Sequence, residues 1–329
     1  MKILVIGSNS FSGSNYVNYL LGRGHEVMAM SRSQEPDSVF LPYKWAAKVP
    51  TNLSFFQLDV NKNLDEIINK VKLFKPIYIV NFAAQGMVAE SWKKPEDWYQ
   101  TNLMSQVKLH NCIRKFDFIE NFLNFSTPEV YGSTDKWIRE SYLFSPNTPY
   151  AVSRAACDLH LMSFYRNYDF PVTFTRAANV FGAGQQLYRI VPKTIISGIL
   201  GSKLSLHGGG SSKRSFIHIG DVSDATYKVM KHGVPGETYH ISTKELISIK
   251  KLVWLIAEKI NKNPDDFVVN TDERLGKDHS YALDSKKIRN ELSWADSISL
   301  EEGLEKTIYW VESNLDVLKK MPANYIHKS

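Results

Sequence analysis

The sequence predicts an α/β fold, a doubly wound parallel sheet with a smaller C-terminal domain beside it. Through the first half of the chain, short β-branched runs alternate with segments of helical periodicity, which is typical of βαβ units. The first run is followed directly by the glycine-containing turn "GSNSFSG", which opens a helix. With 329 residues, the chain is long enough to bury the cores of both parts.

Strands and helices are expected in alternation up to about residue 177. The expected strands are "KILVI", "HEVMAM", "LSFFQL", "IYIVNF", "NFLNF" and "VTFTRA". The expected helices run from the first turn to about Gly22, through "LDEIINKVKLF", near residues 96–116, and after Pro149. Right-handed crossovers between such strands place helices on both faces of one parallel sheet.

The second half of the chain has a different organisation. From about residue 180 we expect short elements separated by glycine and proline, followed by two amphipathic helices around 248–261 and 299–314. We therefore expect a dinucleotide-binding domain over residues 1–178. Residues 179–329 should form mainly a smaller domain, with some segments returning to the first.

Composition and charge exclude several classes of function. The chain is 43% hydrophobic and 22% charged, and it has no apolar run of membrane-spanning length, so we expect a cytoplasmic protein without a membrane partner. Its net charge of +6 is scattered, without the basic stripe of a nucleic-acid binder. The two cysteines, Cys112 and Cys157, lack metal-ligand spacing, and no metal site is predicted.

The turn after the first strand predicts a nucleotide site. Gly7 allows the tight turn, and Gly13 lets the helix approach the strand, so that free N–H groups of the helix face a pyrophosphate. Ser10 replaces the middle glycine of the usual motif. An ordinary glycine-containing turn between strand and helix is the alternative interpretation.

Residues after the next strands refine this hypothesis. Arg32, flanked by Ser31 and Ser33, stands where an acidic residue normally holds a ribose 2′-hydroxyl, and it suits a 2′-phosphate instead. This favours NADP over NAD. Asp59 is interpreted either as a contact for the adenine amino group or as a helix N-cap. The small residues Ala83 and Ala84 allow a ribose or pyrophosphate to lie close to the backbone.

Two further segments carry chemistry. In "STPEVYGS", Pro128 cannot continue a sheet ladder, so the strand ends at or before Thr127 and Glu129 lies at its carboxyl edge, where ligands bind in α/β sheets. In "PYAVSRAAC", Tyr150 and Arg154 are four residues apart on one helix face. A cation beside a phenol stabilises the phenolate, which can then act as a general base.

Several motifs together resemble a known family. They are "NFAAQGMVAESWKKP", "TN" at 101–102, "STPEVYG", "PYAVSR", "NVFGAGQQLYRIVP", "RSFIHIGDV" and "LDSKKIRNELSW". Over nearly its whole length, the chain resembles the extended short-chain dehydrogenase/reductase family. Within that family it is most similar to the nucleotide-sugar 4,6-dehydratases that act on GDP-mannose and dTDP-glucose. This resemblance implies a Rossmann domain, a C-terminal substrate domain and a nucleotide-diphosphate sugar as substrate.

The resemblance also implies roles for individual residues. Tyr150 deprotonates the sugar 4-hydroxyl, Thr127 hydrogen-bonds the same oxygen, and Glu129 removes the C5 proton before the 6-hydroxyl is eliminated. The chain departs from the family pattern at two positions. Pro128 replaces the acid of many dTDP-glucose dehydratases, and Arg154 replaces a lysine.

The complete set of expected site residues is as follows. The catalytic residues are Thr127, Glu129, Tyr150 and Arg154; the cofactor, NADP or NAD, is bound by Gly7, Ser10, Phe11, Gly13, Ser31, Arg32, Ser33, Asp59, Val60, Ala83, Ala84, Gln85, Asn102, Tyr150 and Arg154; and the substrate is bound by Gln85, Asn179, Arg189, Arg214 and Arg274. As in the family, a homodimer or a dimer of dimers is expected, with the helices at about 96–116 and 150–168 pairing across a two-fold axis.

Other functions remain open at this point. A 4-epimerase or a uronate decarboxylase of the same family shares the first oxidation. Glu129 argues against the epimerase, whereas decarboxylases also carry a threonine and a glutamate at this spacing. A catalytically silent nucleotide-binding module is a third reading, suggested by Ser10, Pro128 and Arg154.

Overall fold

The core of the molecule is a seven-stranded sheet whose strands are all parallel. The computed structural model describes the chain except for residues 47–49, 134–135, 273–281 and 329. The strands are β1 (Lys2–Ile6), β2 (Glu26–Ser31), β3 (Leu53–Gln57), β4 (Tyr78–Asn81), β5 (Asn121–Ser126), β7 (Val172–Ala177) and β12 (Thr238–Ile241). Their order is β12-β7-β5-β4-β1-β2-β3, so the direction of winding reverses between β1 and β4. The doubly wound fold predicted from the sequence is confirmed.

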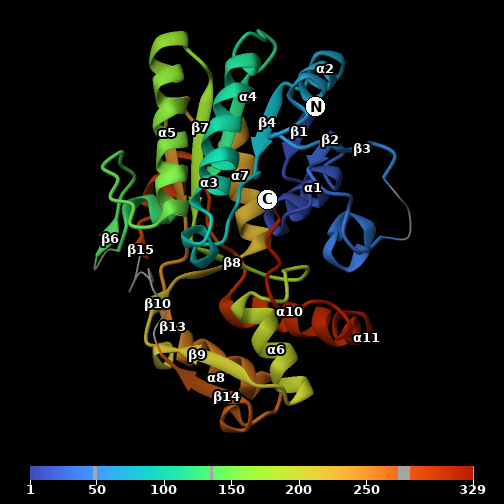
Figure 1. The fold of residues 1–329 in the computed structure, drawn as a ribbon, viewed down its shortest axis with the longest axis vertical. Coiled ribbons are helices and arrows are strands. Elements are labelled where there is room, and N and C mark those ends of the chain that lie inside the picture. The colour runs from blue at the N-terminus through green and yellow to red at the C-terminus, as the bar shows by residue number, and fades with distance from the viewer. Residues whose placement is uncertain (47–49, 134–135, 273–281, 329) are drawn as a thin grey trace.

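Helices cover both faces of this sheet (Figure 1). The helices are α1 (Phe11–Leu21) and α7 (Ile219–His232) on one face, and α2 (Leu64–Phe74), α4 (Ser105–Ile113) and α5 (Pro149–Tyr168) on the other. Strand β1 shows how the two layers are divided. Ile3 and Val5 belong to the first core cluster, whereas Leu4 and Ile6 belong to the second, because successive side chains of a strand point to opposite faces.

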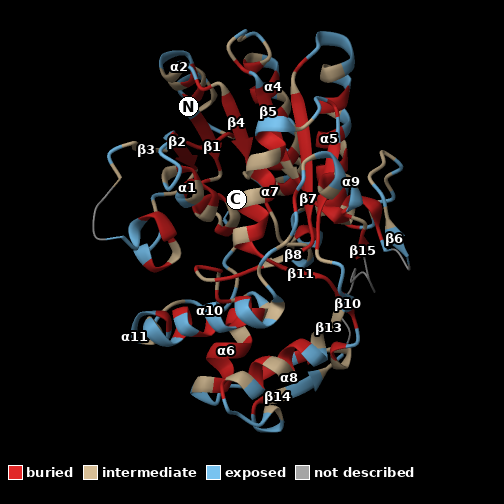
Figure 2. Cartoon of the chain, turned by 180° about the vertical axis from the view of Figure 1, so that it is seen from behind, coloured by how far each residue is buried: buried red, intermediate tan, exposed pale blue. Residues whose placement is uncertain are grey.

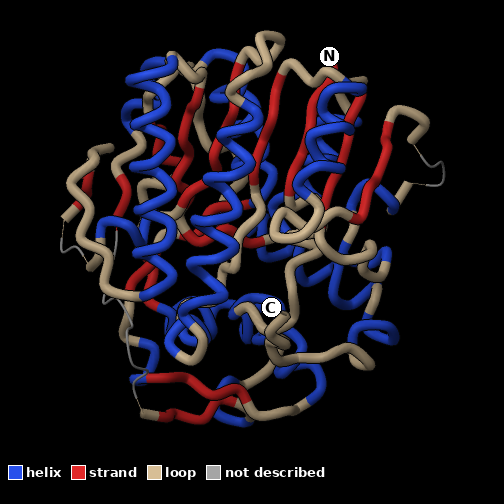
Figure 3. Tube along the Cα trace, turned by 45° about the horizontal axis from the view of Figure 1, so that its top comes forward, coloured by secondary structure: helices blue, strands red, loops and turns tan. Residues whose placement is uncertain are grey.

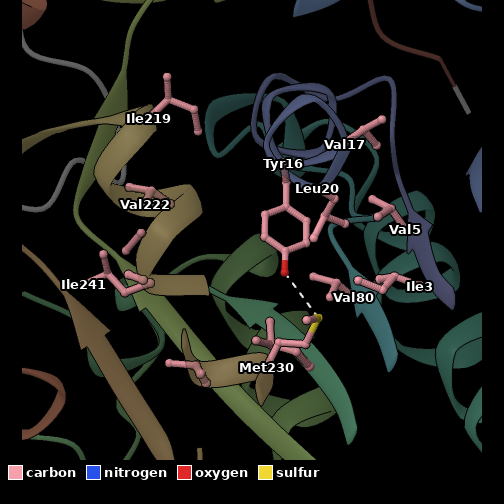
Figure 4. Packing of buried hydrophobic residues seen from close by; sticks show 14 of the residues in the cluster. Ile3, Val5, Tyr16, Val17, Leu20, Val80, Ile219, Val222, Met230 and Ile241 are labelled. Carbon is pink, nitrogen blue, oxygen red and sulfur yellow. Dashed lines mark hydrogen bonds between the residues drawn. The ribbon is translucent and has the colours of Figure 1, made fainter. Parts of the chain in front are cut away.

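The core between α1 and α7 also contains a polar atom. Tyr16 of α1 is completely buried, and its hydroxyl donates to the sulfur of Met230 at 3.3 Å, as the dashed line in Figure 4 shows. The pKa of Tyr16 is raised well above its ordinary value, mainly by burial. The phenol therefore remains protonated and packs as a large core residue whose hydroxyl has a partner.

Predicted element boundaries agree closely with the structure in the first half. Helix α2 covers the predicted segment, and β5 ends at Ser126, two residues before Pro128. The helix expected near 96–116 is divided into α3 (Pro95–Tyr99), a π-helical segment (Gln100–Met104) and α4, which ends at Ile113. A π-helical segment widens the turn locally and often occurs near functional sites.

The remaining elements form a smaller lobe below the carboxyl edge of the sheet (Figures 1 and 3). It contains α6 (Ile190–Leu200), α8 (Ile249–Lys259), α10 (Leu300–Ser313) and α11 (Leu315–Leu318), with the strand pairs β9 (Leu204–His207) with β14 (Val268–Thr271) and β10 (Lys213–Arg214) with β13 (Ile247–Ser248). These helices bury their own core cluster, as the red and blue sides of α10 in Figure 2 illustrate. The two amphipathic helices predicted here are confirmed as α8 and α10.

The expectation of short elements between about residue 180 and the first amphipathic helix was wrong for two helices. Helices α6 and α7 contain 11 and 14 residues. Strand β12 returns to the main sheet beside β7, although it follows α7 in the chain. Two other short parallel pairs are β8 (Asn179–Phe181) with β11 (Phe216–His218), and β6 (Trp137–Ile138) with β15 (Ala282–Leu283), which precedes α9 (Lys286–Glu291).

Candidate active site

A cavity of about 750 Å³ lies at the carboxyl edge of β1 to β4, around the point where the winding of the sheet reverses. Ligands of open α/β sheets bind at such a point. Residues of the predicted nucleotide site that line the cavity are Gly7, Ser10, Ser31, Arg32, Ser33, Asp59, Val60, Ala83 and Ala84. A second cavity of about 450 Å³, beside Glu140 and Asp284, contains none of the predicted site residues.

The turn after β1 is closely packed, and both glycines are required by geometry. Gly7 has a φ of +82°, and a Cβ there would lie 2.6 Å from the backbone nitrogen of Ala83. A Cβ at Gly13 would lie 2.3 Å from the carbonyl oxygen of Gly7. Ser10 caps α1: its hydroxyl accepts from the Gly13 N–H at 3.0 Å and donates to the Gly7 carbonyl at 2.7 Å. The serine therefore stabilises the turn that the usual glycine would only permit.

Arg32 extends into this cavity from the end of β2. Its Nη1 is buried and has no hydrogen-bond partner among the described residues, although a buried guanidinium normally has its donors satisfied. Glu35, one of the two acidic residues that line the cavity, is held elsewhere, because it accepts from the Tyr43 hydroxyl at 2.8 Å and from Lys44 Nζ at 2.6 Å. A cationic side chain that lines the cavity thus has an unsatisfied donor.

Asp59 and Asn102 are positioned by contacts within the chain. One oxygen of Asp59 accepts from the Asn61 N–H at 2.8 Å, and Asn63, not Asp59, directly precedes helix α2. The N-cap interpretation of Asp59 is therefore wrong. The amide of Asn102 bridges the backbone of Gln85, accepting at 2.7 Å and donating at 3.1 Å, and also donates to the Ser153 hydroxyl. It thereby ties the loop after β4 to helix α5.

The predicted catalytic residues come together at the adjacent end of β5. Tyr150 lies in the first turn of α5, which is capped by Thr148, whose hydroxyl accepts from the Ala151 N–H at 3.1 Å. The Thr127 side chain hydrogen-bonds Tyr150, and Glu129 and Arg154 lie within electrostatic range of its hydroxyl. Four residues from two separated segments thus form one cluster.

The charges around Tyr150 oppose one another. Its pKa is raised, first by burial and then by the negative charge of Glu129, whereas Arg154, the Thr127 hydrogen bond and Arg189 lower it. Without a ligand, the phenol is therefore favoured over the phenolate. A further positive charge close to the hydroxyl would favour the phenolate, which is the basic form.

Glu129 lies in a capped turn. Thr127 is the N-cap of a short 3-10 helix, Pro128–Tyr131, and its hydroxyl accepts from the Glu129 N–H at 3.3 Å. Pro128 occupies the first helical position, where its missing N–H costs nothing. The carboxylate is half-buried. This local geometry fixes the acid at the carboxyl edge of the sheet, as the sequence predicted.

Arg154 occupies the position four residues after Tyr150. Its side chain is 2% exposed, and Nη2 donates to the Phe125 carbonyl oxygen of β5 at 2.5 Å, while Nε is buried and has no partner among the described residues. The guanidinium therefore links helix α5 to the strand that carries Thr127. Its charge also acts on Tyr150, whose pKa it lowers.

A buried network supports this cluster from below. Asp158, one turn further along α5, forms an ion pair with Arg176 of β7 at 2.9 Å, and both side chains are completely buried. Asp158 also accepts from the Ser126 hydroxyl at 2.6 Å, and Arg176 donates to the Tyr131 hydroxyl at 2.5 Å. The network therefore holds Ser126 and Tyr131, the residues on either side of the segment that carries Thr127 and Glu129, by hydrogen bonds. Sequence reasoning missed it, because Arg176 reads as part of an ordinary strand.

Of the predicted substrate residues, Gln85 lies in the loop after β4, whereas Asn179, Arg189 and Arg214 lie on or near the smaller lobe. Arg189 immediately precedes α6 and lowers the pKa of Tyr150, so its charge is close to the catalytic cluster. Asn179 begins β8, and Arg214 lies in β10, 8% exposed, with Nη1 donating to the Lys213 carbonyl at 2.8 Å. Arg274 lies outside the described residues.

Other residues at the site were not expected from the sequence. Gln186, Tyr188 and Lys328 line the main cavity. Ser91 is completely buried, and its hydroxyl accepts from the Tyr150 N–H at 3.3 Å, which fixes the start of α5 against the loop after β4. Ser91, Gln186 and Tyr188 lie within motifs that carry the family resemblance, but nothing in those motifs singles them out, because each acquires its place through a contact distant in sequence.

Comparison with known proteins agrees with this geometry. The family model described as GDP-mannose 4,6 dehydratase matches residues 4–307. A dTDP-D-glucose 4,6-dehydratase from Homo sapiens is 34% identical over 320 residues, which cover 95% of this chain and 90% of the relative. The crystal structure of a dTDP-glucose 4,6-dehydratase from Streptomyces venezuelae with NAD bound is similar at a TM-score of 0.88 and 27% identity, covering 96% of this chain and 98% of that chain.

A third relative is longer. A trifunctional UDP-glucose 4,6-dehydratase/UDP-4-keto-6-deoxy-D-glucose 3,5-epimerase/UDP-4-keto-L-rhamnose-reductase from Arabidopsis thaliana is 28% identical over 318 residues. The match covers 95% of this chain but 47% of the relative, so the chain spans about half of that protein's length.

Within the described part of the chain, no helix combines the length and apolar character that crossing a membrane requires.

Proposed function

Because the chain belongs to the GDP-mannose 4,6-dehydratase family, we propose that it is a nucleotide-sugar 4,6-dehydratase that depends on a nicotinamide dinucleotide. It converts a nucleotide-diphosphate hexose into the 4-keto-6-deoxy sugar nucleotide by loss of water. The observation that carries the proposal is the position of Glu129 beside Tyr150 and Thr127 at the carboxyl edge of the sheet.

The residues of the cluster divide the reaction between them. Tyr150 takes the proton of the sugar 4-hydroxyl, and Thr127 hydrogen-bonds the same oxygen. Arg154 stabilises the phenolate, in keeping with its effect on the Tyr150 pKa. The nicotinamide supplies the redox chemistry, accepting hydride from C4 and returning it to C6. With C4 oxidised to a ketone, the C5 proton is acidic, and Glu129 removes it as the 6-hydroxyl departs.

The proton required by the departing hydroxyl comes from a different source than in many dTDP-glucose dehydratases. Pro128 stands at the position of their aspartate and has no proton to donate. Glu129 gains a proton from C5 in the same step. We infer that this carboxyl group, directly or through one water molecule, returns the proton to the leaving oxygen.

The cavity at β1 to β4 fits a nicotinamide dinucleotide. Gly7 and Gly13 let the turn, the first turn of α1 and the backbone of Ala83 pack closely together, and Gly7, Ala83 and Ala84 line the cavity, where the helix N-terminus can face a pyrophosphate. The relative from Streptomyces venezuelae was solved with NAD. In this chain, the unsatisfied Nη1 of Arg32 and the engagement of Glu35 elsewhere favour a 2′-phosphate, and hence NADP.

The choice of cofactor is tested by the variant Arg32→Ala. Loss of a charge-assisted bond to the 2′-phosphate should weaken NADP binding by about tenfold or more, while NAD binding changes little. Calorimetric titration of both nucleotides measures the two affinities. Equal weakening of both would show that Arg32 contacts a part that they share.

Two-fold symmetry with a second copy is also proposed. Helix α5 and the π-helical segment expose apolar side chains at Met104, Val152 and Leu159. An isologous contact between two copies would bury these side chains. Sedimentation at micromolar concentration should give a dimer or a dimer of dimers, and Leu159→Lys should lower the assembly state. A monomer would contradict this arrangement.

Two steps test the dehydratase assignment. A mass-spectrometric screen of GDP-, UDP-, dTDP- and CDP-sugars for loss of water identifies the substrate. With that substrate, Glu129→Gln keeps the size of the side chain but removes the base. Reduced nicotinamide should then accumulate on the enzyme, and product formation should fall about a hundredfold or more.

The control variants separate the two proton transfers. Tyr150→Phe should suppress both reduced nicotinamide and product, because its proton transfer belongs to the first step. Glu312→Gln, at an exposed position of α10, should leave both unchanged. If Glu129→Gln dehydrates the sugar at nearly the wild-type rate, Glu129 is only a turn residue without a catalytic role. The dehydratase assignment then loses its main support.

The same screen separates the competing functions. A uronate decarboxylase would release carbon dioxide from a uronic acid nucleotide, and a 4-epimerase would interconvert two sugars of equal mass. Tight nucleotide binding without turnover of any sugar would identify a silent binding module.

A further inference from the structure

The last described residues of the chain lie between the two lobes. After α11, the segment 322–328 turns back toward the sheet, so that the C-terminus lies at the centre of the molecule in Figures 1 and 3. Residues 325–328 follow a bend at 323–324 and form no helix or strand, and alternate residues face the protein: Tyr325 and His327 are half-buried, whereas Ile326 is 63% exposed. This alternation indicates a docked segment.

One side of the segment is anchored to α3. The Nε2 atom of His327 lies 2.7 Å from the Asp97 carboxylate. The His327 ring stacks on Trp98 with a centroid distance of 5.0 Å and an interplanar angle of 7°. Trp98 is completely buried. Thus a buried aromatic ring and a carboxylate of the large lobe together bind the His327 side chain.

The other side of the segment contacts the wall of the cofactor cavity. The Gln85 amide donates to the Lys328 carbonyl oxygen at 2.6 Å, and Lys328 itself lines the cavity together with Gly7 and Arg32. Tyr325 packs edge-on against Tyr188, another residue of the cavity wall, at a centroid distance of 5.5 Å. The segment therefore contacts residues at the cavity from both the large and the smaller lobe.

Tyr325 is also close to charges on both sides of the cavity. Burial raises the pKa of its hydroxyl, while Arg32 and Arg189 lower it. Arg32 directly follows β2, and Arg189 precedes α6 in the smaller lobe. The segment thus spans the opening from the predicted 2′-phosphate side to the predicted sugar side.

We propose that residues 322–328 form a strap that lies across the bound nicotinamide dinucleotide and slows its release. This inference rests on the proposed function, which places that cofactor in the cavity. With the segment docked, the cavity still measures about 750 Å³. This lies within the range of roughly 300–1,000 Å³ that small-molecule and cofactor sites occupy, so the strap and the ligand fit together.

Retention suits the chemistry. In the proposed reaction the hydride taken from C4 is returned to C6, so the cofactor is regenerated in every turnover and its exchange is unnecessary. A strap that closes the opening would keep the nucleotide in place between the two hydride transfers. Its contacts are made by Gln85, Asp97 and Trp98 of the large lobe and by Tyr188 of the cavity wall.

The test compares two variants of the full chain. The double variant Tyr325→Ala/His327→Ala removes both inward-facing rings, and Ile326→Ala, at the exposed position between them, is the matched control. Fluorescent reduced nicotinamide dinucleotide, NADPH or NADH, is bound to each protein and displaced by an excess of the oxidised form in a stopped-flow instrument. The double variant should release the reduced nucleotide about tenfold faster, and the control should match the parent.

The possible outcomes distinguish the strap from the proposed function. Equal release rates in all three proteins, or slower release from the double variant, would overturn the strap while leaving the cofactor site intact. If none of the proteins binds either reduced nucleotide, the cofactor site itself is wrong, and the strap is overturned with it.

Discussion

The buried ion pair between Asp158 and Arg176 allows the sharpest prediction about stability and catalysis together. Both side chains are completely buried, and their atoms lie 2.9 Å apart. Asp158→Asn keeps the volume of the side chain but removes the charge. Arg176 then retains its positive charge away from water, and among the described residues it faces the Tyr131 hydroxyl, the rings of Tyr131 and Phe144, and the new amide.

The magnitude follows from the state in which Arg176 is left. Removing one partner of a buried ion pair costs about 3–5 kcal/mol, because the remaining charge is desolvated without compensation. Asp158 also accepts hydrogen bonds from Ser126 at 2.6 Å and Asn124 at 2.9 Å, and an amide can accept only part of these. We expect Asp158→Asn to lower the free energy of unfolding by about 3 kcal/mol.

The same variant should impair catalysis. Ser126 and Tyr131 flank Thr127 and Glu129, and the network holds them on both sides. Loosening them should lower kcat by about tenfold or more and change KM less, because the bound sugar keeps its other contacts.

Urea denaturation followed by circular dichroism measures the stability, and a coupled assay of sugar dehydration measures kcat and KM. The double variant Asp158→Leu/Arg176→Met removes both charges and should be more stable than Asp158→Asn. Glu302→Gln, which breaks the exposed pair with Lys306, should cost less than about 0.5 kcal/mol. A loss below about 1 kcal/mol in Asp158→Asn would refute the reasoning, because it would show that Arg176 does not depend on its partner.

Three further predictions concern titration and the cation at position 154. Glu129 raises the pKa of Tyr150, so Glu129→Gln should shift the pH profile of the first hydride transfer to lower pH. Nicotinamide absorbance in single turnovers measures this transfer. A shift to higher pH would contradict the assigned charge effect. Burial lowers the pKa of His218 from 6.5 to about 4, and its Nδ1 accepts from the Gly220 N–H, so the unfolded chain takes up the proton first. The contribution of His218 to the free energy of unfolding should therefore be fully present above pH 6.5 and fall by up to about 3 kcal/mol as the pH approaches 4. His218→Asn retains an acceptor but does not titrate. In this variant, urea midpoints measured across the same pH range should change less. Arg154→Lys should keep kcat within about tenfold of the parent, whereas Arg154→Met should lower it about a hundredfold, since the phenolate needs a neighbouring positive charge; equal rates for the two variants would show that the charge is unimportant.

Several features were determined by local sequence alone. The alternation of strands and helices predicted the parallel sheet, because the two periods of hydrophobic residues differ and persist over many residues. The position of Pro128 predicted the end of β5, since proline has no N–H for the ladder. The spacing of Tyr150 and Arg154 placed them on one helix face, and Arg154 and Glu129 both lie close enough to Tyr150 to shift its pKa.

Sequence patterns were weaker where the elements are short or the cue is ambiguous. Strand β12 contains four residues, too few to show a period, and only its pairing with β7 makes it part of the sheet. Ser10 looked like a departure from the glycine motif, yet its hydroxyl caps α1 and donates to the carbonyl of Gly7. Such a cap is visible only when the backbone around it is known.

Contacts between distant parts of the chain were decided by tertiary structure. Arg176 meets Asp158 because β7 lies beside β5 under helix α5, and nothing near either residue in the sequence indicates a partner. Lys328 reaches Gln85, which is 243 residues away, only because the last segment folds back between the lobes. Local periodicity and turn chemistry determine what each segment becomes. Which side chains share a buried site depends on how the segments pack, and that is a property of the whole fold.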